Sequence, residues 1–212
     1  MTTFTDLRMD IYDEISQYLS DADLGNLLLS CREVAVSAHI LRDRKRAYWR
    51  RCGADNFAEK GNLLALQFLH SIDMISYTSG LMKKAAGNAH LPVVKFLHSI
   101  GVPYGTDSLY YAASNGHLAV LEFLHDIYNI NLSYIPILMY EAAYRGHLNV
   151  VKFLYNIGPK DACYTMVAAA ITGHLPVVEF LYSVGVPCTE RAMKAAFLNN
   201  HLDLVNFFKA NS

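Results

Sequence analysis

The sequence has little net charge and no long hydrophobic run. Its 212 residues include 18 basic and 19 acidic side chains, for a formal net charge of -1 at pH 7. Without an overall positive field, we expect neither nucleic acid nor an anionic membrane as a partner. No apolar stretch approaches the roughly 18 residues of a membrane-spanning helix, and the opening MTTFTDLRMD does not form a secretory leader. We therefore predict a cytoplasmic protein.

Cysteine is scarce, and the motifs of common enzyme sites are missing. No cysteine belongs to a C-x-x-C pair, which favours reduced thiols over a disulfide framework or a zinc site. The four cysteines are Cys31, Cys52, Cys163 and Cys188. The sequence also lacks H-E-x-x-H, a phosphate-cradling glycine loop and a nucleophile elbow. We expect no catalytic residue, no metal and no cofactor.

What the sequence does contain is an internal repeat. Six segments share one apolar pattern: GNLLALQFLH, AHLPVVKFLH, GHLAVLEFLH, GHLNVVKFLY, GHLPVVEFLY and NHLDLVNFFK. Their anchors are Asn62, His90, His117, His147, His174 and His201, separated by 28, 27, 30, 27 and 27 residues. A near-constant period of this length is typical of a solenoid, in which each unit buries its apolar face against its neighbours.

Each repeat is predicted to be a hairpin of two helices. From His90 onward, a large apolar residue and an alanine stand eight and five residues before the histidine, on one face of a first helix. A glycine such as Gly146 can then end that helix in left-handed geometry. A second helix with a broad apolar face follows. We therefore predict an all-α fold, a helical-hairpin solenoid of about six short repeats.

The repeated histidines are predicted to be structural. Neighbouring helices pack about 8 to 10 Å apart, so equivalent histidines form a row, whereas zinc needs donors about 2.0 to 2.3 Å from one centre. No repeated carboxylate or serine accompanies these histidines. We expect each ring to tie its turn to backbone groups of the next repeat.

The pattern A-A-x-x-G-H-L-x-V-V-x-F-L is similar to the ankyrin repeat over residues 53–212. The period is shorter than that family's 33 residues, and its T-P-L-H opening is absent. Similar short repeats are common in ankyrin proteins of large DNA viruses. The resemblance implies a non-enzymatic binding module with an unknown protein target on its concave face.

In that family the two positions before Gly-His face the concave surface. Tyr144 and Arg145 occupy them in the middle of the array and are residue types that often anchor interfaces. Tyr110, Tyr111 and Tyr140 lie on the same first helices, where they either extend the surface or fill gaps between repeats. The residues that we predict to bind the target are Ser114, Asn115, Tyr144, Arg145, Ile171 and Thr172.

A segment of different character precedes the repeats. Two short helices with apolar faces are predicted there. The residues that set their pattern are Leu7, Asp10, Ile11, Ile15, Leu19, Asp23, Leu24, Leu27 and Arg32. In this order they resemble an F-box over residues 4–40. Arg8 replaces that family's proline, and Val34 stands near its usual tryptophan. F-box helices dock on the Skp-type adaptor of an SCF-type cullin-RING ubiquitin ligase. Carried over by position, the docking residues would be Leu7, Ile11, Ile15, Leu19, Leu24 and Leu27.

The segment LRDRKRAYWRRC, residues 41–52, links the two parts. We interpret it as a helix with a solvated basic face and with Tyr48 and Trp49 packed inward; a nuclear-localisation patch is the alternative. The domains would be residues 4–52, F-box-like with a basic linker helix, and residues 53–212, ankyrin-like. We predict a substrate receptor for the ligase. The alternative is a stand-alone ankyrin binding or inhibitory module whose amino-terminal helices only cap the solenoid.

Overall fold

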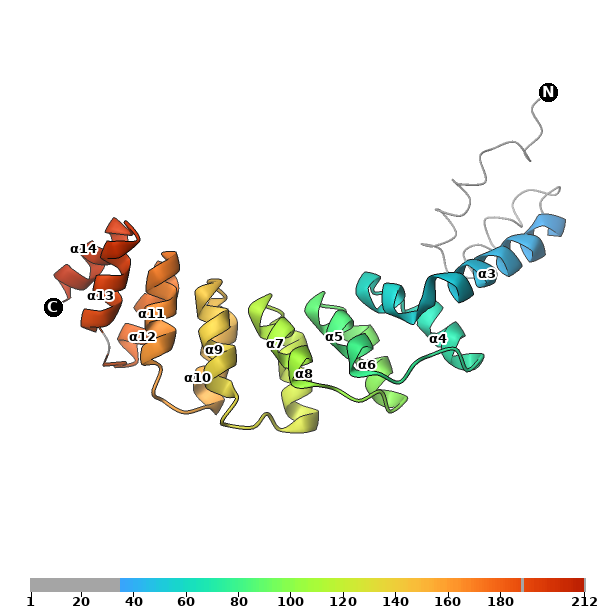
Figure 1. Cartoon of the computed structure of the whole chain (residues 1–212), viewed down its shortest axis with the longest axis horizontal. Helices are drawn as coiled ribbons and strands as arrows, with labels where there is room; N and C mark the ends of the chain where they lie inside the picture. Colours follow the sequence, from blue (N-terminus) through green and yellow to red (C-terminus); the bar gives the residue numbers. More distant parts are fainter. Residues whose placement is uncertain (1–34, 188, 212) are drawn as a thin grey trace, which may run out of the picture. The chain divides into compact units, whose positions relative to one another are not determined.

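The computed structural model describes residues 35–187 and 189–211, and every regular element in these ranges is a helix (Figure 1). The described residues form two compact units. The first contains residues 35–57 and Asn62–Ser76, and the second contains Ala58–Gly61 and the chain from Tyr77 onward. The predicted domain boundary between residues 52 and 53 stays a prediction.

The first unit is organised around Trp49. Helix α3, Ala35–Lys60, carries the basic segment and bends at Gly53, which has φ 74° and ψ 158°. The Trp49 side chain is only 3% exposed, and its ring lies 5.5 Å from that of Phe68 on helix α4, Leu63–Ser71. Arg46 and Arg50 are exposed, and each guanidinium lies 5.5 Å from the centre of the Phe68 ring. The prediction of an inward-facing Trp49 beneath a basic, solvated face is therefore confirmed.

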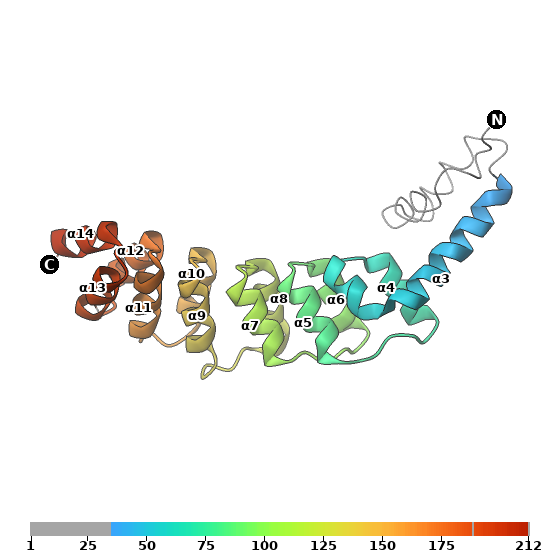
Figure 2. The ribbon, with the colours of Figure 1, turned by 45° about the horizontal axis from the view of Figure 1, so that its top comes forward.

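The second unit is a stack of helical hairpins. Their paired helices are α5 (Ser79–Gly87) and α6 (Leu91–Ser99), α7 (Thr106–Ser114) and α8 (Leu118–Tyr128), α9 (Ile135–Tyr144) and α10 (Leu148–Ile157), α11 (Cys163–Thr172) and α12 (Leu175–Ser183), and α13 (Thr189–Leu198) and α14 (Leu202–Ala210). In Figures 1 and 2 the first helices stand side by side in one layer, and the second helices form the other layer. The first helices are α5, α7, α9, α11 and α13, and the second helices are α6, α8, α10, α12 and α14. Helix α4 carries the second-helix segment of the first repeat copy.

Small side chains let the first helices approach one another. The repeated alanine five residues before each histidine is fully buried in every hairpin, as at Ala142, where the side chain is 0% exposed. The second helices contribute the larger core residues, of which Val150, Val151 and Leu154 on α10 are 0% exposed. Close packing of alanine against neighbouring helices, with aliphatic residues behind it, gives the stack one continuous core. The predicted all-α hairpin solenoid is confirmed.

The turn between the two helices of a hairpin is a Schellman motif. In the α9–α10 hairpin, the His147 N–H donates to the Ala142 carbonyl at 2.8 Å and the Gly146 N–H donates to the Ala143 carbonyl at 3.1 Å. Gly146 has φ 80°, a conformation that costs glycine nothing. Ala89 and Asn200 take the same left-handed conformation where glycine is replaced, with φ 62° and 59°.

The longer third connector adds one local feature. Helix α8 runs to Tyr128, and Asn129 ends it with φ 50°. The Asn131 side chain then accepts hydrogen bonds from the Ser133 N–H at 2.9 Å and the Ser133 hydroxyl at 2.8 Å. This side-chain turn occupies the extra residues before Pro136 opens α9.

One prediction about the cysteines is wrong. Cys163, the first residue of α11, is disulfide-bonded, whereas Cys52 is a free thiol. Disulfides persist mainly in oxidising compartments, so cysteine usage no longer supports the prediction of a cytoplasmic protein. Among the described residues, no helix is both long and apolar enough to cross a lipid bilayer.

Candidate protein-interaction face

The turn histidines join successive repeats. Each ring bonds to a backbone carbonyl of the preceding repeat. That carbonyl belongs to the residue two positions before the one with positive φ that ends the turn. The Nε2–O distances are 2.9 Å for His90 to Glu59, 3.0 Å for His117 to Gly87, 2.9 Å for His147 to Ser114, 3.1 Å for His174 to Tyr144, and 2.9 Å for His201 to Ile171. A carbonyl can only accept, so Nε2 carries the hydrogen. The histidines are structural, but they bond to the preceding repeat, not to the next one as predicted.

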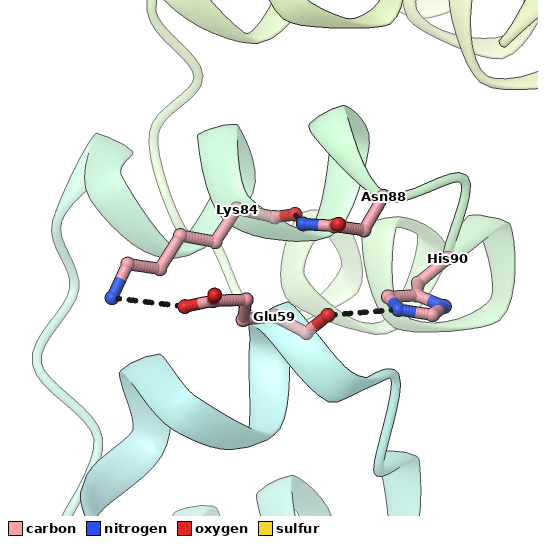
Figure 3. Close-up of polar contacts among 4 residues, drawn as sticks. All are labelled: Glu59, Lys84, Asn88 and His90. Carbon is pink, nitrogen blue, oxygen red and sulfur yellow. Dashed lines mark hydrogen bonds and ion pairs between the residues drawn. The ribbon is translucent and has the colours of Figure 1, made fainter. Parts of the chain in front are cut away.

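Figure 3 shows the first of these bonds together with its neighbours. The His90 ring donates to the Glu59 carbonyl, while the Glu59 carboxylate lies 3.8 Å from the Lys84 ammonium. The Asn88 amide donates to the Lys84 carbonyl at 2.9 Å and so caps the end of α5. Residue 59 is therefore joined to this hairpin through both its backbone and its side chain.

The glycine of the Gly-His pair also serves the next repeat. A Cβ placed on Gly146 would lie 2.6 Å from the His174 Nδ1 atom, and one on Gly116 would lie 2.5 Å from the His147 Nδ1 atom. Gly61 and Gly173 meet His90 and His201 in the same way. At these four glycines the ring occupies the volume where a side chain would begin, so a Cβ there would require the ring to shift. Ala89 shows that a shifted arrangement exists, because His117 keeps the equivalent bond to the Gly87 carbonyl beside it.

The row of histidines has no metal-binding geometry. Burial lowers the pKa of His147, and the positive charges of His117, Arg145 and His174 add to this effect, while the hydrogen bond to the Ser114 carbonyl opposes it. Each ring bonds to its own carbonyl. Within residues 35–187 and 189–211, no group of three or more histidine, cysteine or acidic residues could hold a metal ion.

The predicted target-binding residues differ in how accessible they are. The Tyr144 side chain is 43% exposed, and Arg145 and Asn115 are exposed as well. Ser114 is 1% exposed, because the α9 hairpin covers it and His147 binds its carbonyl. A partner that binds this face cannot reach the Ser114 side chain.

The other predicted residues are partly engaged in the fold. Ile171 and Thr172 are half-buried, and the Thr172 hydroxyl donates to the Ala168 carbonyl at 3.1 Å. The Asn115 amide donates to the Gly87 carbonyl at 2.8 Å, the same oxygen that His117 reaches. Their side chains are therefore held in defined positions on the first helices.

The first helices expose additional apolar residues that the two positions before Gly-His do not include. Ile137 is 50% exposed, Tyr164 is 73% exposed and Tyr111 is 38% exposed. Tyr140 is half-buried and stacks on Tyr144 at 6.3 Å with 12° between the ring planes. Ile137 and Tyr164 both stand ten residues before their histidine. The sequence could have indicated these two residues, because the positions ten and three residues before the histidine lie on one face of the helix.

The second helices show a different surface. Each aromatic ring that ends a second helix packs edge-on against the phenylalanine of the following hairpin, as in Tyr155 with Phe180 at 5.7 Å and Tyr182 with Phe207 at 5.4 Å. His125 and Phe153 do the same at 5.7 Å. This contact explains why the position is histidine in the earlier repeats and tyrosine in the later ones, since either ring can pack there.

The predicted adaptor-binding residues lie outside the described residues. They are Leu7, Ile11, Ile15, Leu19, Leu24 and Leu27. Their docking role stays a prediction that rests on the F-box resemblance.

Comparison with known proteins assigns part of the stack. Residues 82–125, from α5 to α8, match the family of ankyrin repeats that occur in many copies. No curated protein matches the chain. The same turn, glycine and histidine bond recur in the hairpins that follow the matched segment. Residues 82–125 therefore consist of ankyrin repeats, a fold that serves as a protein-protein interaction module.

Proposed function

We propose that the chain is a substrate receptor: its first helices bind a target protein and its amino-terminal segment recruits an SCF-type cullin-RING ubiquitin ligase. The observation that carries the target-binding half is the distribution of exposed apolar side chains. In the five hairpins, six of the seven exposed large hydrophobic residues within helices belong to first helices: Tyr111, Ile137, Tyr144, Tyr164, Phe197 and Leu198. The seventh is Leu202, the first residue of α14. We call this surface the first-helix face.

The second helices support the same choice. The exposed positions on α10 are Asn149, Lys152 and Asn156, and those on α12 are Pro176, Glu179 and Ser183. A polar surface of this kind gives a protein partner little apolar area to bury. Exposed aromatic residues concentrated on one layer favour that layer as the binding surface.

The ligase half of the proposal rests on the F-box resemblance of residues 4–40. An F-box would dock on a Skp-type adaptor through the six apolar residues already named. In such a receptor the ankyrin repeats would hold the target while the ligase transfers ubiquitin to it. A cytoplasmic location, or the host cytoplasm if the source is a large DNA virus, belongs to this proposal; a nuclear location is the alternative.

The competing proposal is an ankyrin binding or inhibitory module with no ligase link. The first-helix face would then have the same role, and the amino-terminal helices would only cap the stack. The two proposals differ in a single interaction, the one with the adaptor.

Coprecipitation of the full chain with a purified Skp-type adaptor separates these proposals. We expect the wild type to bind, and we expect Ile15→Asp and Leu24→Asp to abolish binding because a charge cannot enter an apolar interface unpaired. Gln17→Ala is the matched control, since residue 17 lies on the opposite side of the same predicted helix. Circular dichroism and urea unfolding establish that each variant is folded. Absence of wild-type binding, or undiminished binding by both folded aspartate variants, would leave only the stand-alone module.

A further inference from the structure

Two adjacent helices of the first-helix face, α9 and α11, carry a group of apolar residues at equivalent positions. Residues ten, seven and three positions before the histidine share one side of a helix, and on α9 and α11 all six are apolar. They are Ile137, Tyr140, Tyr144, Tyr164, Val167 and Ile171, each exposed or half-buried. We call these six residues the central patch.

The central patch has the size of a short peptide segment. Seven residues of helix rise about 10 Å, and adjacent helices lie about 8 to 10 Å apart. An area of these dimensions accommodates two or three large side chains.

Basic side chains border the central patch on its carboxyl-terminal side. On α13 the positions equivalent to Tyr164 and Val167 are Arg191 and Lys194, and both side chains are exposed. The position equivalent to Ile171 is Leu198, which is 69% exposed and apolar. Arg145 is exposed at the end of α9. Within the described part of the chain, none of these three cations forms an ion pair with an acidic side chain. Glu190 is the exposed carboxylate beside them on α13.

Acidic side chains on the amino-terminal side of the face are already engaged. The Asp107 carboxylate lies 3.4 Å from the Lys83 ammonium. Glu141 faces Tyr110, and partial burial together with the Glu141 charge raises the pKa of Tyr110. On helices α9, α11 and α13 and at their ends, the described side chains without an ion pair are three cations, Arg145, Arg191 and Lys194, and two carboxylates, Glu141 and Glu190.

The aromatic part of the face is held in place before any partner binds. Tyr140 and Tyr144 stack on each other, and Tyr110 and Tyr111 pack edge to face at 5.5 Å. The Lys83 ammonium lies 4.7 Å from the centre of the Tyr111 ring. Rings fixed in this way lose little conformational entropy when a partner covers them.

We infer that the first-helix face binds an acidic segment of its partner, whose two or three apolar side chains cover the central patch while its carboxylates reach Arg145, Arg191 and Lys194. This inference rests on the proposed target-binding role of the face. Apolar contact supplies most of the affinity, and the unpaired cations select an acidic sequence over a basic one.

The test is panning of a phage-displayed random-peptide library on the full chain, followed by binding assays with the enriched peptides. We expect enriched sequences to combine aspartate or glutamate with large apolar residues, and their affinity to fall as salt rises. Tyr144→Ala should weaken binding about tenfold or more, as truncation of an interface anchor does. Lys194→Glu should weaken it severalfold, whereas Lys209→Glu on α14 makes the same charge change on the other layer and should have no effect.

The possible outcomes separate the inference from the proposed function. Peptides that need Tyr144 but contain no acidic residues, or that bind Lys194→Glu as well as wild type, would refute the acidic partner and keep the target-binding face. Peptides that ignore Tyr144→Ala, or a library that yields no enriched peptide, would refute the face as well. Urea unfolding of every variant establishes that lost binding is not lost folding.

Discussion

Substitution of Gly146 by alanine tests the contact between successive repeats, because two separate constraints favour glycine at this position. Its φ of 80° is unfavourable for alanine, which costs about 1 kcal/mol. The new Cβ would also lie 2.6 Å from the His174 Nδ1 atom. The ring would have to shift, as the His117 ring is placed beside Ala89, and this would weaken its hydrogen bond to the Tyr144 carbonyl, a further loss of up to about 1 kcal/mol. We expect Gly146→Ala to lower the free energy of unfolding by more than the backbone cost alone, up to about 2 kcal/mol in all.

Gly101→Ala is the matched control. Gly101 has the same φ of 80°, but no atom lies within 4 Å of the position that its Cβ would take. Only the backbone cost of about 1 kcal/mol applies there. Urea unfolding followed by circular dichroism measures both variants against the wild type. If Gly101→Ala lowers the free energy of unfolding as much as Gly146→Ala does, the contact with the histidine ring does not contribute to stability and this reasoning is wrong.

Three further predictions concern the same stack. Ala89→Gly should raise the free energy of unfolding slightly, by about 0.5 kcal/mol, because it relieves a left-handed alanine with φ 62° at some cost in unfolded-state entropy; urea unfolding measures the change. Leu154→Ala should cost about 3 kcal/mol and at least as much as Phe153→Ala, because Leu154 is 0% exposed whereas Phe153 is half-buried; the opposite order of urea midpoints would show that the aromatic contact dominates. The third prediction concerns pH. The pKa of His147 is lowered in the fold. As the pH falls, the imidazole of His147 therefore takes up a proton in the unfolded chain before it does so in the folded chain. The free energy of unfolding should then decline as the pH falls below about 6.5. His147→Gln keeps an N–H donor for the Ser114 carbonyl but cannot titrate, so its urea midpoint should depend less on pH than that of the wild type; an equal dependence would exclude His147 as the cause.

The position of the repeats and the geometry of their turns could be predicted from the sequence. Helical spacing identified the buried residues, since Val150, Val151 and Leu154 fall on one face of a helix and all three are 0% exposed. Glycine before histidine identified the left-handed helix end, and Gly146 has that conformation. These features depend on neighbours within a few residues, so local pattern is enough to predict them.

The accessibility of the candidate site could be predicted only in part. Ser114 and Tyr144 occupy the same repeat position, yet one is 1% exposed and the other 43% exposed. A small serine is covered by the next hairpin, whereas a tyrosine ring extends beyond it. Conversely, Ile137 and Tyr164 are exposed seven residues before the positions that the ankyrin resemblance selects.

The sequence by itself determined the hairpin, its period and the residues that each hairpin buries, because these follow from helical periodicity and turn chemistry. Only the tertiary structure decided what each histidine joins. Its ring bonds a carbonyl about thirty residues earlier, as in His174 with Tyr144, and that partner depends on the offset between stacked hairpins. The same stacking placed the central patch beside the unpaired cations of the next hairpin. No local pattern specifies either result, because both depend on contacts between repeats.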